Sequence, residues 1–343
     1  MSTNPNIDIE EQIEILVRAS GISIGETFVK EMLRTSLGLG KDELSTLDLK
    51  IASSALKEMR EAFQMFTPYA QRRKVTIFGS ARTTKDDPVY RQTEQVAARL
   101  AGENWMVVTG AGPGIMEAGM AGAGRGSSIG VSIRLPFETS ANPIIAGDEK
   151  YVSMKYFFTR KLMLVKESHA FICMPGGFGT LDEMFELLTL TQTGKSTPAP
   201  IVLLDLPGDH FWHRIDELIA EQLVPRKLVS HTDRALYHLS SNVDDAVREI
   251  CGFYENYDSM RQVGKYLVVR HRHRITDQQL GVLNDEFTHL CSEGFIERTD
   301  PLAPEIASRD SLEARRLRFR FNRRDYGELR RLINRLNSFG PTG

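Results

Sequence analysis

The sequence has few cysteines and no long run of apolar residues. Its three cysteines, Cys173, Cys251 and Cys291, are odd in number and widely spaced, which favours reduced thiols over a disulfide framework or a zinc site. No apolar stretch approaches the roughly 18 residues that cross a bilayer, and the N-terminus lacks the basic-then-apolar pattern of a signal peptide. We therefore expect a cytoplasmic protein without a membrane span, a metal site or a cofactor.

Neither sign of charge dominates the chain. It has 43 Lys and Arg against 45 Asp and Glu, and 41% of its residues are hydrophobic, which excludes a largely disordered or fibrous protein. From Arg261 onward, however, 16 basic residues stand against 11 acidic ones. This basic end could meet an anionic surface of a neighbouring subunit, a nucleotide effector or RNA. A solvated basic face is the plainer alternative.

Residues 1–70 are predicted to form a helical extension. Apolar residues recur at a spacing of three to four in Glu10–Ser20, Ser23–Leu37 and Lys41–Phe66, and Gly38 marks a break. These amphipathic faces could pack on the core or on a second subunit, and the sequence leaves both open. We hypothesise that the extensions regulate or lock an oligomer.

Residues 71–260 are predicted to form an α/β domain with a Rossmann-like, doubly wound parallel sheet. Short apolar runs alternate with helical stretches, which is typical of a parallel sheet covered on both faces. The predicted strands are Lys74–Phe78, Trp105–Thr109, Ser128–Ile133, Ala170–Met174 and Ile201–Leu204. The predicted helices are Tyr90–Gly102, Ile115–Ala123, Met154–Lys166, Leu181–Thr193, Phe211–Gln222 and Val243–Tyr254. Ligands of such a sheet bind at the carboxyl ends of the strands.

Residues 261–343 are predicted to form a small basic α/β unit. Its regular segments are expected at Tyr266–Arg270, Asp277–Cys291, Arg316–Phe321 and Asp325–Leu336. The stretch Thr299–Asp310 holds two prolines and predicts a loop. His271 and His273 alternate with arginines, so we expect them at the surface.

Glycine-bearing loops follow three of the predicted strands. The first begins at Gly79 and Ser80, the second spans Gly110, Gly112 and Gly114, and the third runs from Pro175 to Thr180. Two of them open into helices, whose free N–H groups and dipole attract anions. The loops together predict a phosphate-bearing ligand.

Two common nucleotide motifs are missing. The second loop lacks the full G-x-G-x-x-G spacing, and no carboxylate stands at Ser132–Arg134, where a ribose-binding acid would fall. No G-x-x-x-x-G-K-[ST] sequence occurs either. These absences argue against an NAD(P) site and against a P-loop.

The third loop continues as Pro-Gly-Gly-Phe-Gly-Thr-Leu-Asp-Glu, from Pro175 to Glu183. Its glycines would let the backbone curl round an oxyanion, with Thr180 at the start of a helix and Glu183 one turn in. Thr180 and Glu183 also fit a capping box, in which both only satisfy backbone donors. Capping alone leaves the three preceding glycines without a reason.

This loop, together with the helix before it, resembles the LONELY GUY family of phosphoribohydrolases, which is also described as lysine decarboxylase-like. The family signature Pro-Gly-Gly-x-Gly-Thr-x-x-Glu stands at Pro175–Glu183, and its paired Arg-Lys stands at Arg160-Lys161. The resemblance covers residues 72–225. It implies hydrolysis of a nucleoside 5′-monophosphate, AMP-like or cytokinin-type, to free base and ribose 5-phosphate, in a subunit that forms a homodimer or a higher homo-oligomer.

The resemblance also assigns roles to single positions. Arg160 and Glu183 match the catalytic pair. The positions that match substrate contacts are Gly79, Ser80, Gly110, Gly112, Gly114, Glu138, Lys161, Gly176, Gly177, Phe178, Gly179, Thr180 and Thr189. No metal and no cofactor is implied.

General physical chemistry is consistent with these roles. Departure of a base leaves positive charge on C1′ of the sugar, which a fixed carboxylate such as Glu183 would stabilise. Near a helix N-terminus the ionised form of Glu183 is expected, so it would act as a stabiliser or base. Arg160 could clamp the phosphate or the leaving base, or could form a surface salt bridge with Glu167.

Two other functions stay open at this point. A nucleotide-binding sensor would keep the phosphate loop with little turnover, although binding alone would not need both Arg160 and Glu183. A carrier of a phosphate-bearing cofactor such as a molybdopterin is the second alternative.

Overall fold

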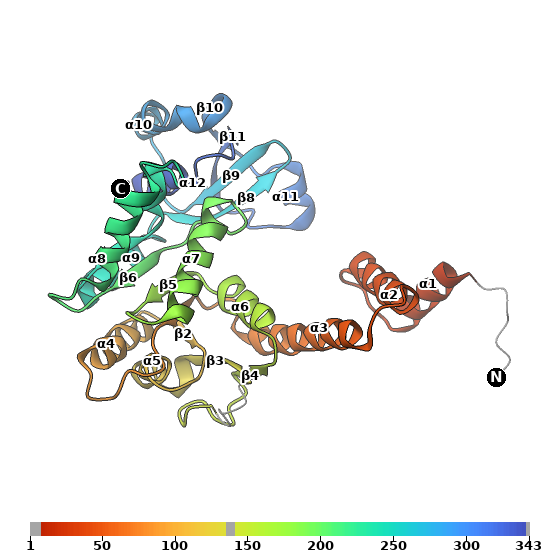
Figure 1. The fold of residues 1–343 in the computed structure, drawn as a ribbon. Coiled ribbons are helices and arrows are strands. Elements are labelled where there is room, and N and C mark those ends of the chain that lie inside the picture. The colour runs from red at the N-terminus through yellow and green to blue at the C-terminus, as the bar shows by residue number, and fades with distance from the viewer. Residues whose placement is uncertain (1–7, 135–140, 341–343) are drawn as a thin grey trace. The chain divides into compact units, whose positions relative to one another are not determined.

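The computed structural model describes residues 8–134 and 141–340 of the chain. They fall into two compact units, residues 1–61 and residues 62–343, which are labelled along the ribbon in Figure 1. The described ranges contain no helix long and apolar enough to cross a membrane.

The first unit is helical, as predicted. It consists of α1 (Ile9–Ala19), α2 (Glu26–Lys41) and most of α3 (Thr46–Phe66). Ion pairs from Lys30 to Glu14 and from Arg34 to Glu10, both at 2.6 Å, join α2 to α1. The predicted break at Gly38 is wrong, because α2 continues to Lys41; a glycine inside a helix costs only about 1 kcal/mol relative to alanine.

The second unit is built on a seven-stranded parallel sheet within the described part of the chain. Its strands are β1 (Lys74–Phe78), β2 (Met106–Thr109), β3 (Ser128–Ile133), β4 (Tyr151–Met154), β5 (Ala170–Cys173), β6 (Ile201–Leu204) and β7 (His238–Ser240). Their order in the sheet is β4-β3-β2-β1-β5-β6-β7. The chain thus winds outward in one direction from β1 and in the other from β5, which confirms the doubly wound fold and makes the β1–β5 gap its switch point.

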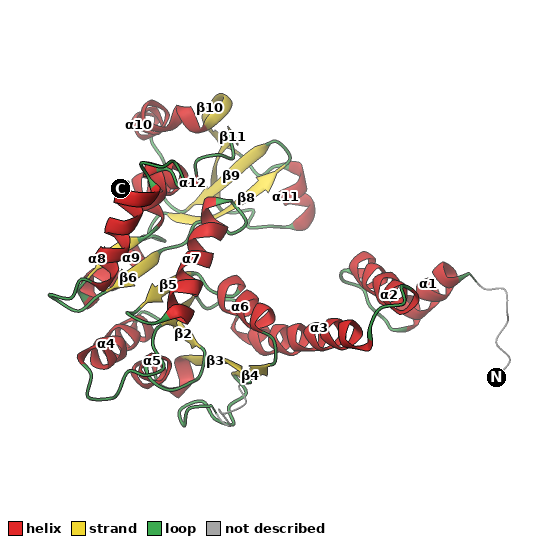
Figure 2. Cartoon of the chain, viewed as in Figure 1, coloured by secondary structure: helices red, strands yellow, loops and turns green. Residues whose placement is uncertain are grey.

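Helices lie on both faces of this sheet (Figure 2). They are α4 (Pro88–Gly102), α5 (Ile115–Ala123), α6 (Phe157–Lys166), α7 (Phe178–Gln192), α8 (Phe211–Leu218) and α9 (Val243–Gly252). The predicted start of α6 at Met154 is wrong. Tyr151–Met154 instead pairs with β3 as an edge strand, and the extended backbone of Tyr156 precedes the helix.

A second sheet, antiparallel, follows. Its strands are β8 (Tyr257–Val263), β9 (Tyr266–His271), β10 (Cys291–Thr299) and β11 (Arg315–Phe321), in the order β10-β11-β9-β8. The helices α10 (Asp277–Phe287) and α12 (Tyr326–Asn337) complete this region. Its inner face shares one apolar core with the parallel sheet, because Leu317 and Leu329 belong to the same buried cluster as Val75 and Ile172.

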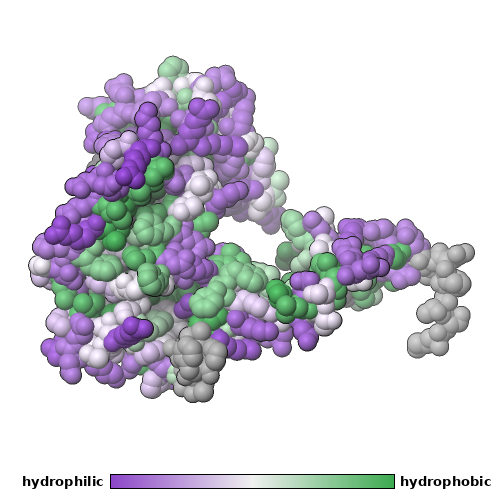
Figure 3. Space-filling model, viewed as in Figure 1, coloured by the Kyte–Doolittle hydropathy of each residue, from purple (hydrophilic) through white to green (hydrophobic). Residues whose placement is uncertain are grey.

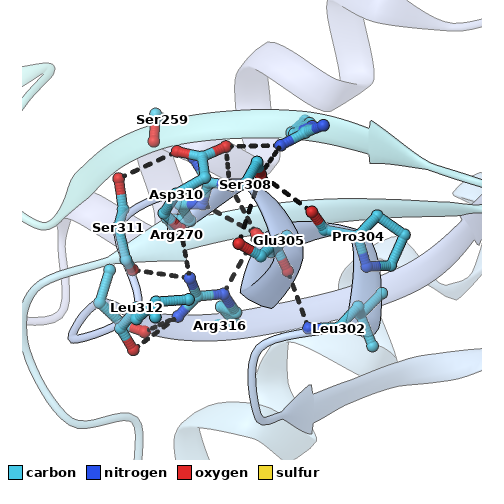
Figure 4. A network of polar contacts seen from close by, with 12 residues as sticks. Ser259, Arg270, Leu302, Pro304, Glu305, Ser308, Asp310, Ser311, Leu312 and Arg316 are labelled. Atoms are coloured by element: carbon cyan, nitrogen blue, oxygen red, sulfur yellow. Dashed lines mark hydrogen bonds and ion pairs between the residues drawn. The ribbon is translucent and has the colours of Figure 1, made fainter.

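Two expectations for this region are wrong. Residues 299–310 are not only a loop, since they contain α11 (Ala303–Ser308). Its Glu305 is fully buried and binds Arg270 at 2.5 Å and Arg316 at 3.3 Å (Figure 4), which fixes the segment on the sheet. His271 is buried, not exposed, because its ring lies on the packed part of β9 and bonds with the carbonyl of His273 at 2.8 Å.

Candidate active site

A pocket of about 650 Å³ opens at the carboxyl ends of β1, β2 and β5. The loop Phe78–Arg82 and the first turns of α7, from Gly177 to Glu183, form two of its walls. Arg160 of α6 and Met116 of α5 close it from the other side. The pocket therefore lies at the switch point of the sheet, where ligands of this fold class bind.

Glycines allow the three loops of the pocket to meet. A side chain at Gly176 would lie 2.2 Å from Oγ1 of Thr180 and 3.1 Å from the nitrogen of Ser80. Gly114 has a φ of +67°, and a side chain there would lie 2.4 Å from the carbonyl oxygen of Ser80. The same carbonyl accepts a hydrogen bond from the nitrogen of Ile115 at 3.0 Å. The loops could not pack this closely with larger residues.

The helix α7 presents unused backbone donors to the pocket. It begins at Phe178. Its cap residue is Gly177, which has no side chain that could accept a hydrogen bond from the helix. The nitrogens of Thr180 and Leu181 donate to the carbonyl of Gly177, so the first donors of the helix, on Phe178 and Gly179, have no intrahelical acceptor. The capping-box alternative is wrong, because Thr180 stands inside the helix. The helix start is an anion site by its donors and its dipole.

Glu183 lies in the second turn of α7 and is buried, with 6% of its surface exposed. Its Oε2 atom has no hydrogen-bond partner among the described residues. Burial raises the pKa of Glu183 above its ordinary value, although the charges of Lys161 and Arg160 oppose the shift. Burial thus opposes the stabilisation of the ionised form that was expected from the helix start.

Lys161 lies beside this carboxylate, in α6. Its ammonium group binds Asp182 at 2.7 Å and Glu186 at 2.6 Å, and it lies 3.7 Å from Glu183. Burial lowers the pKa of Lys161, but the hydrogen bonds with Asp182 and Glu186 outweigh this effect and raise it above its ordinary value. Lys161 is therefore a fixed positive charge next to Glu183.

Arg160 points from α6 toward the strand ends. Its Nε atom donates to the carbonyl of Val131 at 3.0 Å. Its guanidinium group passes over Gly110, where a side chain would lie 2.1 Å from Nη2. Glu167, the acid considered as its surface partner, forms an ion pair with Lys166 at 2.5 Å. Arg160 thus presents its charge to the pocket.

The structure brings together most of the residues to which the sequence assigned substrate contacts. Those that line the pocket are Gly79, Ser80, Gly110, Gly177, Phe178, Gly179 and Thr180. Gly112, Gly114, Gly176 and Lys161 are not among the lining residues, but the loops and helices that line the pocket carry them. Thr189 lies apart, because it faces a separate small pocket next to Leu223 and Tyr237. Glu138 lies outside the described residues.

The pocket also holds residues to which the sequence interpretation assigned no contact, among them Arg82, Met116 and Phe157. Arg82 lies in the first glycine loop and Met116 follows the second, so both could have been noticed there, whereas Phe157 belongs to no motif. No group of three or more metal-binding side chains occurs within residues 8–134 and 141–340.

Comparison with known proteins identifies the family. A family model described as "Possible lysine decarboxylase" matches residues 114–250. The cytokinin riboside 5′-monophosphate phosphoribohydrolase of Mycobacterium tuberculosis is 32% identical over 164 residues, which are 45% of this chain and 81% of that protein. The chain belongs to the LONELY GUY family. As a member of this family, it is a hydrolase that acts on a glycosidic bond.

Other relatives match shorter stretches. The phosphoribohydrolase LOG of Oryza sativa subsp. japonica is 34% identical over 92 residues, and the match covers 26% of this chain and 36% of the rice protein. Among solved structures, the molybdenum cofactor carrier protein of Chlamydomonas reinhardtii is 16% identical, with 53% of this chain and 97% of that chain covered at a TM-score of 0.37. A TM-score this low supports no assignment. The family model, which matches residues 114–250, leaves the helical first unit and the antiparallel sheet unmatched.

Proposed function

We propose that this protein hydrolyses the N-glycosidic bond of a nucleoside 5′-monophosphate, AMP-like or cytokinin-type, to free base and ribose 5-phosphate. One observation carries the proposal. Glu183 is a buried carboxylate whose Oε2 atom makes no hydrogen bond to the described residues, and it lines the same pocket as the open N-terminus of its own helix. A nucleotide with its phosphate at the helix start and its sugar carbon at the carboxylate would span these two features.

The chemistry follows from the two ends of the pocket. The phosphate accepts hydrogen bonds from the nitrogens of Phe178 and Gly179, which fixes the ribose relative to α7. As the bond from C1′ to the base nitrogen breaks, the bonding electrons leave with the base and positive charge develops on C1′. Ionised Glu183 stabilises this charge and accepts a proton from the water whose oxygen bonds to C1′, and the departing base takes up a proton from solvent to become the free base.

The charges around Glu183 support its role as a base. Burial raises the pKa of Glu183, which makes its carboxylate a stronger proton acceptor than an exposed one. Lys161 and Arg160 oppose this shift, so the pKa rises less than burial alone would raise it. Arg160 has its guanidinium in the pocket and would stabilise the negative charge on the phosphate or on the departing base.

We also infer that the subunit forms at least a homodimer. Large apolar side chains of α6 and α7 are exposed near the mouth of the pocket, with Phe157 56% and Phe178 93% exposed, and Figure 3 shows apolar side chains gathered over these helices. Contact with a second copy would remove them from water.

Three further expectations stay predictions. They are the domain division at residues 70 and 260, the cytoplasmic location, and an effector at the basic C-terminal unit.

A turnover assay tests the function. Purified protein is incubated with a panel of nucleoside 5′-monophosphates, and free base and ribose 5-phosphate are followed by chromatography, with Glu183→Gln and Arg160→Ala as variants. We expect release from at least one monophosphate, none from the matching nucleosides, and a loss of about 10²–10⁴ in kcat for Glu183→Gln. Nucleotide binding without release from any monophosphate would favour the sensor. Copurification of another phosphate-bearing molecule, seen by native mass spectrometry, would favour the carrier.

A further inference from the structure

Arg82 lines the pocket near the start of α7. It lies in the first glycine loop and lines the pocket together with Gly177 and Gly179 of the α7 start. Its backbone nitrogen donates to Oγ of Ser80 at 3.1 Å, and the carbonyl of Ser80 is held by Ile115 at 3.0 Å. Hydrogen bonds therefore hold the backbone from which the side chain of Arg82 extends.

The other positive groups of the site are already engaged by the protein. Arg160 bonds to the carbonyl of Val131, and Lys161 binds Asp182 and Glu186. Farther along the first loop, Lys85 forms an ion pair with Glu117 at 2.9 Å. In contrast, the guanidinium group of Arg82 makes no hydrogen bond or ion pair with any described residue. Arg82 is therefore a cation of the pocket lining whose guanidinium group has no partner among the described residues.

We propose that Arg82 binds the 5′-phosphate of the substrate and makes the enzyme selective for nucleotides over nucleosides, an inference that rests on the proposed function. The donors of Phe178 and Gly179 and the dipole of α7 offer only partial positive charge to the phosphate. A guanidinium group adds a full charge and two parallel N–H donors, which suit a phosphate better than the single point of an ammonium group. The close approach of Ser80 to Gly176 brings the two parts of this phosphate site together.

Binding measurements test this role without depending on turnover. Calorimetry gives the Kd of ribose 5-phosphate and of adenosine for the wild type, Arg82→Ala and Arg82→Lys. For Arg82→Ala we expect the Kd of ribose 5-phosphate to rise by about 10- to 100-fold, with partial recovery in Arg82→Lys. The Kd of adenosine should stay the same. Arg99→Ala is the matched control, because Arg99 pairs with Asp244 on the exposed surface of α4.

The outcomes separate this proposal from the proposed function. An unchanged Kd of ribose 5-phosphate in Arg82→Ala overturns the role of Arg82. An equal loss of affinity for adenosine also overturns it, because this result would indicate a contact with the base or sugar. Binding of ribose 5-phosphate by a wild type that releases no base from any monophosphate would reject the hydrolase activity, while the Kd series would still decide on Arg82. A wild type that does not bind ribose 5-phosphate would overturn both.

Discussion

The ammonium nitrogen of Lys161 lies 3.7 Å from Oε2 of Glu183, while its short contacts go to Asp182 and Glu186. At this separation the two groups interact through charge more than through a hydrogen bond. Burial raises the pKa of Glu183, Lys161 lowers it, and the two neighbouring acids raise it further. The protonation of Glu183 is thus set by a cluster on α6 and α7 and not by its helix position alone.

Replacement of Lys161 should therefore move the pH dependence of hydrolysis. In Lys161→Gln the buried carboxylate of Glu183 loses a cation, and its pKa rises further above the ordinary value. The acidic limb of kcat/KM for the preferred monophosphate should therefore shift to higher pH. A full pH–rate profile measures this. Lys265→Gln, on the exposed turn between β8 and β9, should keep the wild-type profile, and a shift of Lys161→Gln to lower pH would contradict the role of this charge.

Gly110 makes room for Arg160, which leads to a second prediction. A methyl group at this position would lie 2.1 Å from Nη2 of Arg160, so Gly110→Ala should displace the guanidinium from the pocket. We expect kcat/KM to fall by about 10²-fold, because small misplacements of such groups are costly. Gly112→Ala is the matched control, since its methyl group would meet only the flexible end of Met116. Equal activity of the two variants would show that Arg160 need not lie over Gly110.

The sequence predicted the parallel sheet well because its strands are apolar along their whole length. Every residue of β1 and β5 is buried, which leaves a clear signal of a strand covered on both faces. The edge strand β4 is buried only at alternate positions, and such a short pattern resembles the start of a helix. The helix α11 has local start signals, because Pro304 lies in its first turn and Glu305 accepts a hydrogen bond from the nitrogen of Leu302. The two prolines were interpreted as a loop, and the contact of Glu305 with Arg270, 35 residues away, could not be seen in the sequence.

The sequence also located some features of the site and not others. The glycines and the Arg160-Lys161 pair could be located from their motifs, because close backbone approaches require particular residues. The raised pKa of Glu183 could not, since it depends on burial and on Lys161, Asp182 and Glu186 together. Arg82 lies in the first glycine loop but was assigned no role from the sequence, and only the fold shows that it shares a pocket with α7.

The end of α7 lies against α12, which gives a third prediction. Gly194 has a φ of +68°, and a methyl group there would lie 1.9 Å from the hydroxyl of Tyr326. Gly194→Ala should therefore suffer both backbone strain and a clash, and we expect it to lower the free energy of unfolding by about 2 kcal/mol. Gly208→Ala isolates the strain, because Gly208 has a φ of +85° and open space around it. Urea unfolding compares the two variants, and equal losses would mean that Tyr326 moves aside freely.

The buried acid Glu305 should be essential for the stability of the antiparallel sheet. It is fully buried and contacts the guanidinium groups of Arg270 and Arg316 (Figure 4). Removal of one charge from such a group leaves the others buried without compensation. Glu305→Gln should therefore lower the free energy of unfolding by about 3 kcal/mol, whereas Glu297→Gln, which removes an exposed partner of Arg318, should cost less than about 1 kcal/mol.

The pH dependence of this loss provides an independent check. Burial acts to raise the pKa of Glu305, but the hydrogen bonds from Arg270 and the nitrogen of Leu302 outweigh it and hold the pKa below its ordinary value. A carboxyl whose pKa is lowered by folding contributes stability above its unfolded pKa and loses it as the pH falls through the folded one. The difference between wild type and Glu305→Gln should therefore be greatest near neutral pH and shrink in acid. A difference that stays constant down to the acid transition would mean that Glu305 acts by its shape and not by its charge.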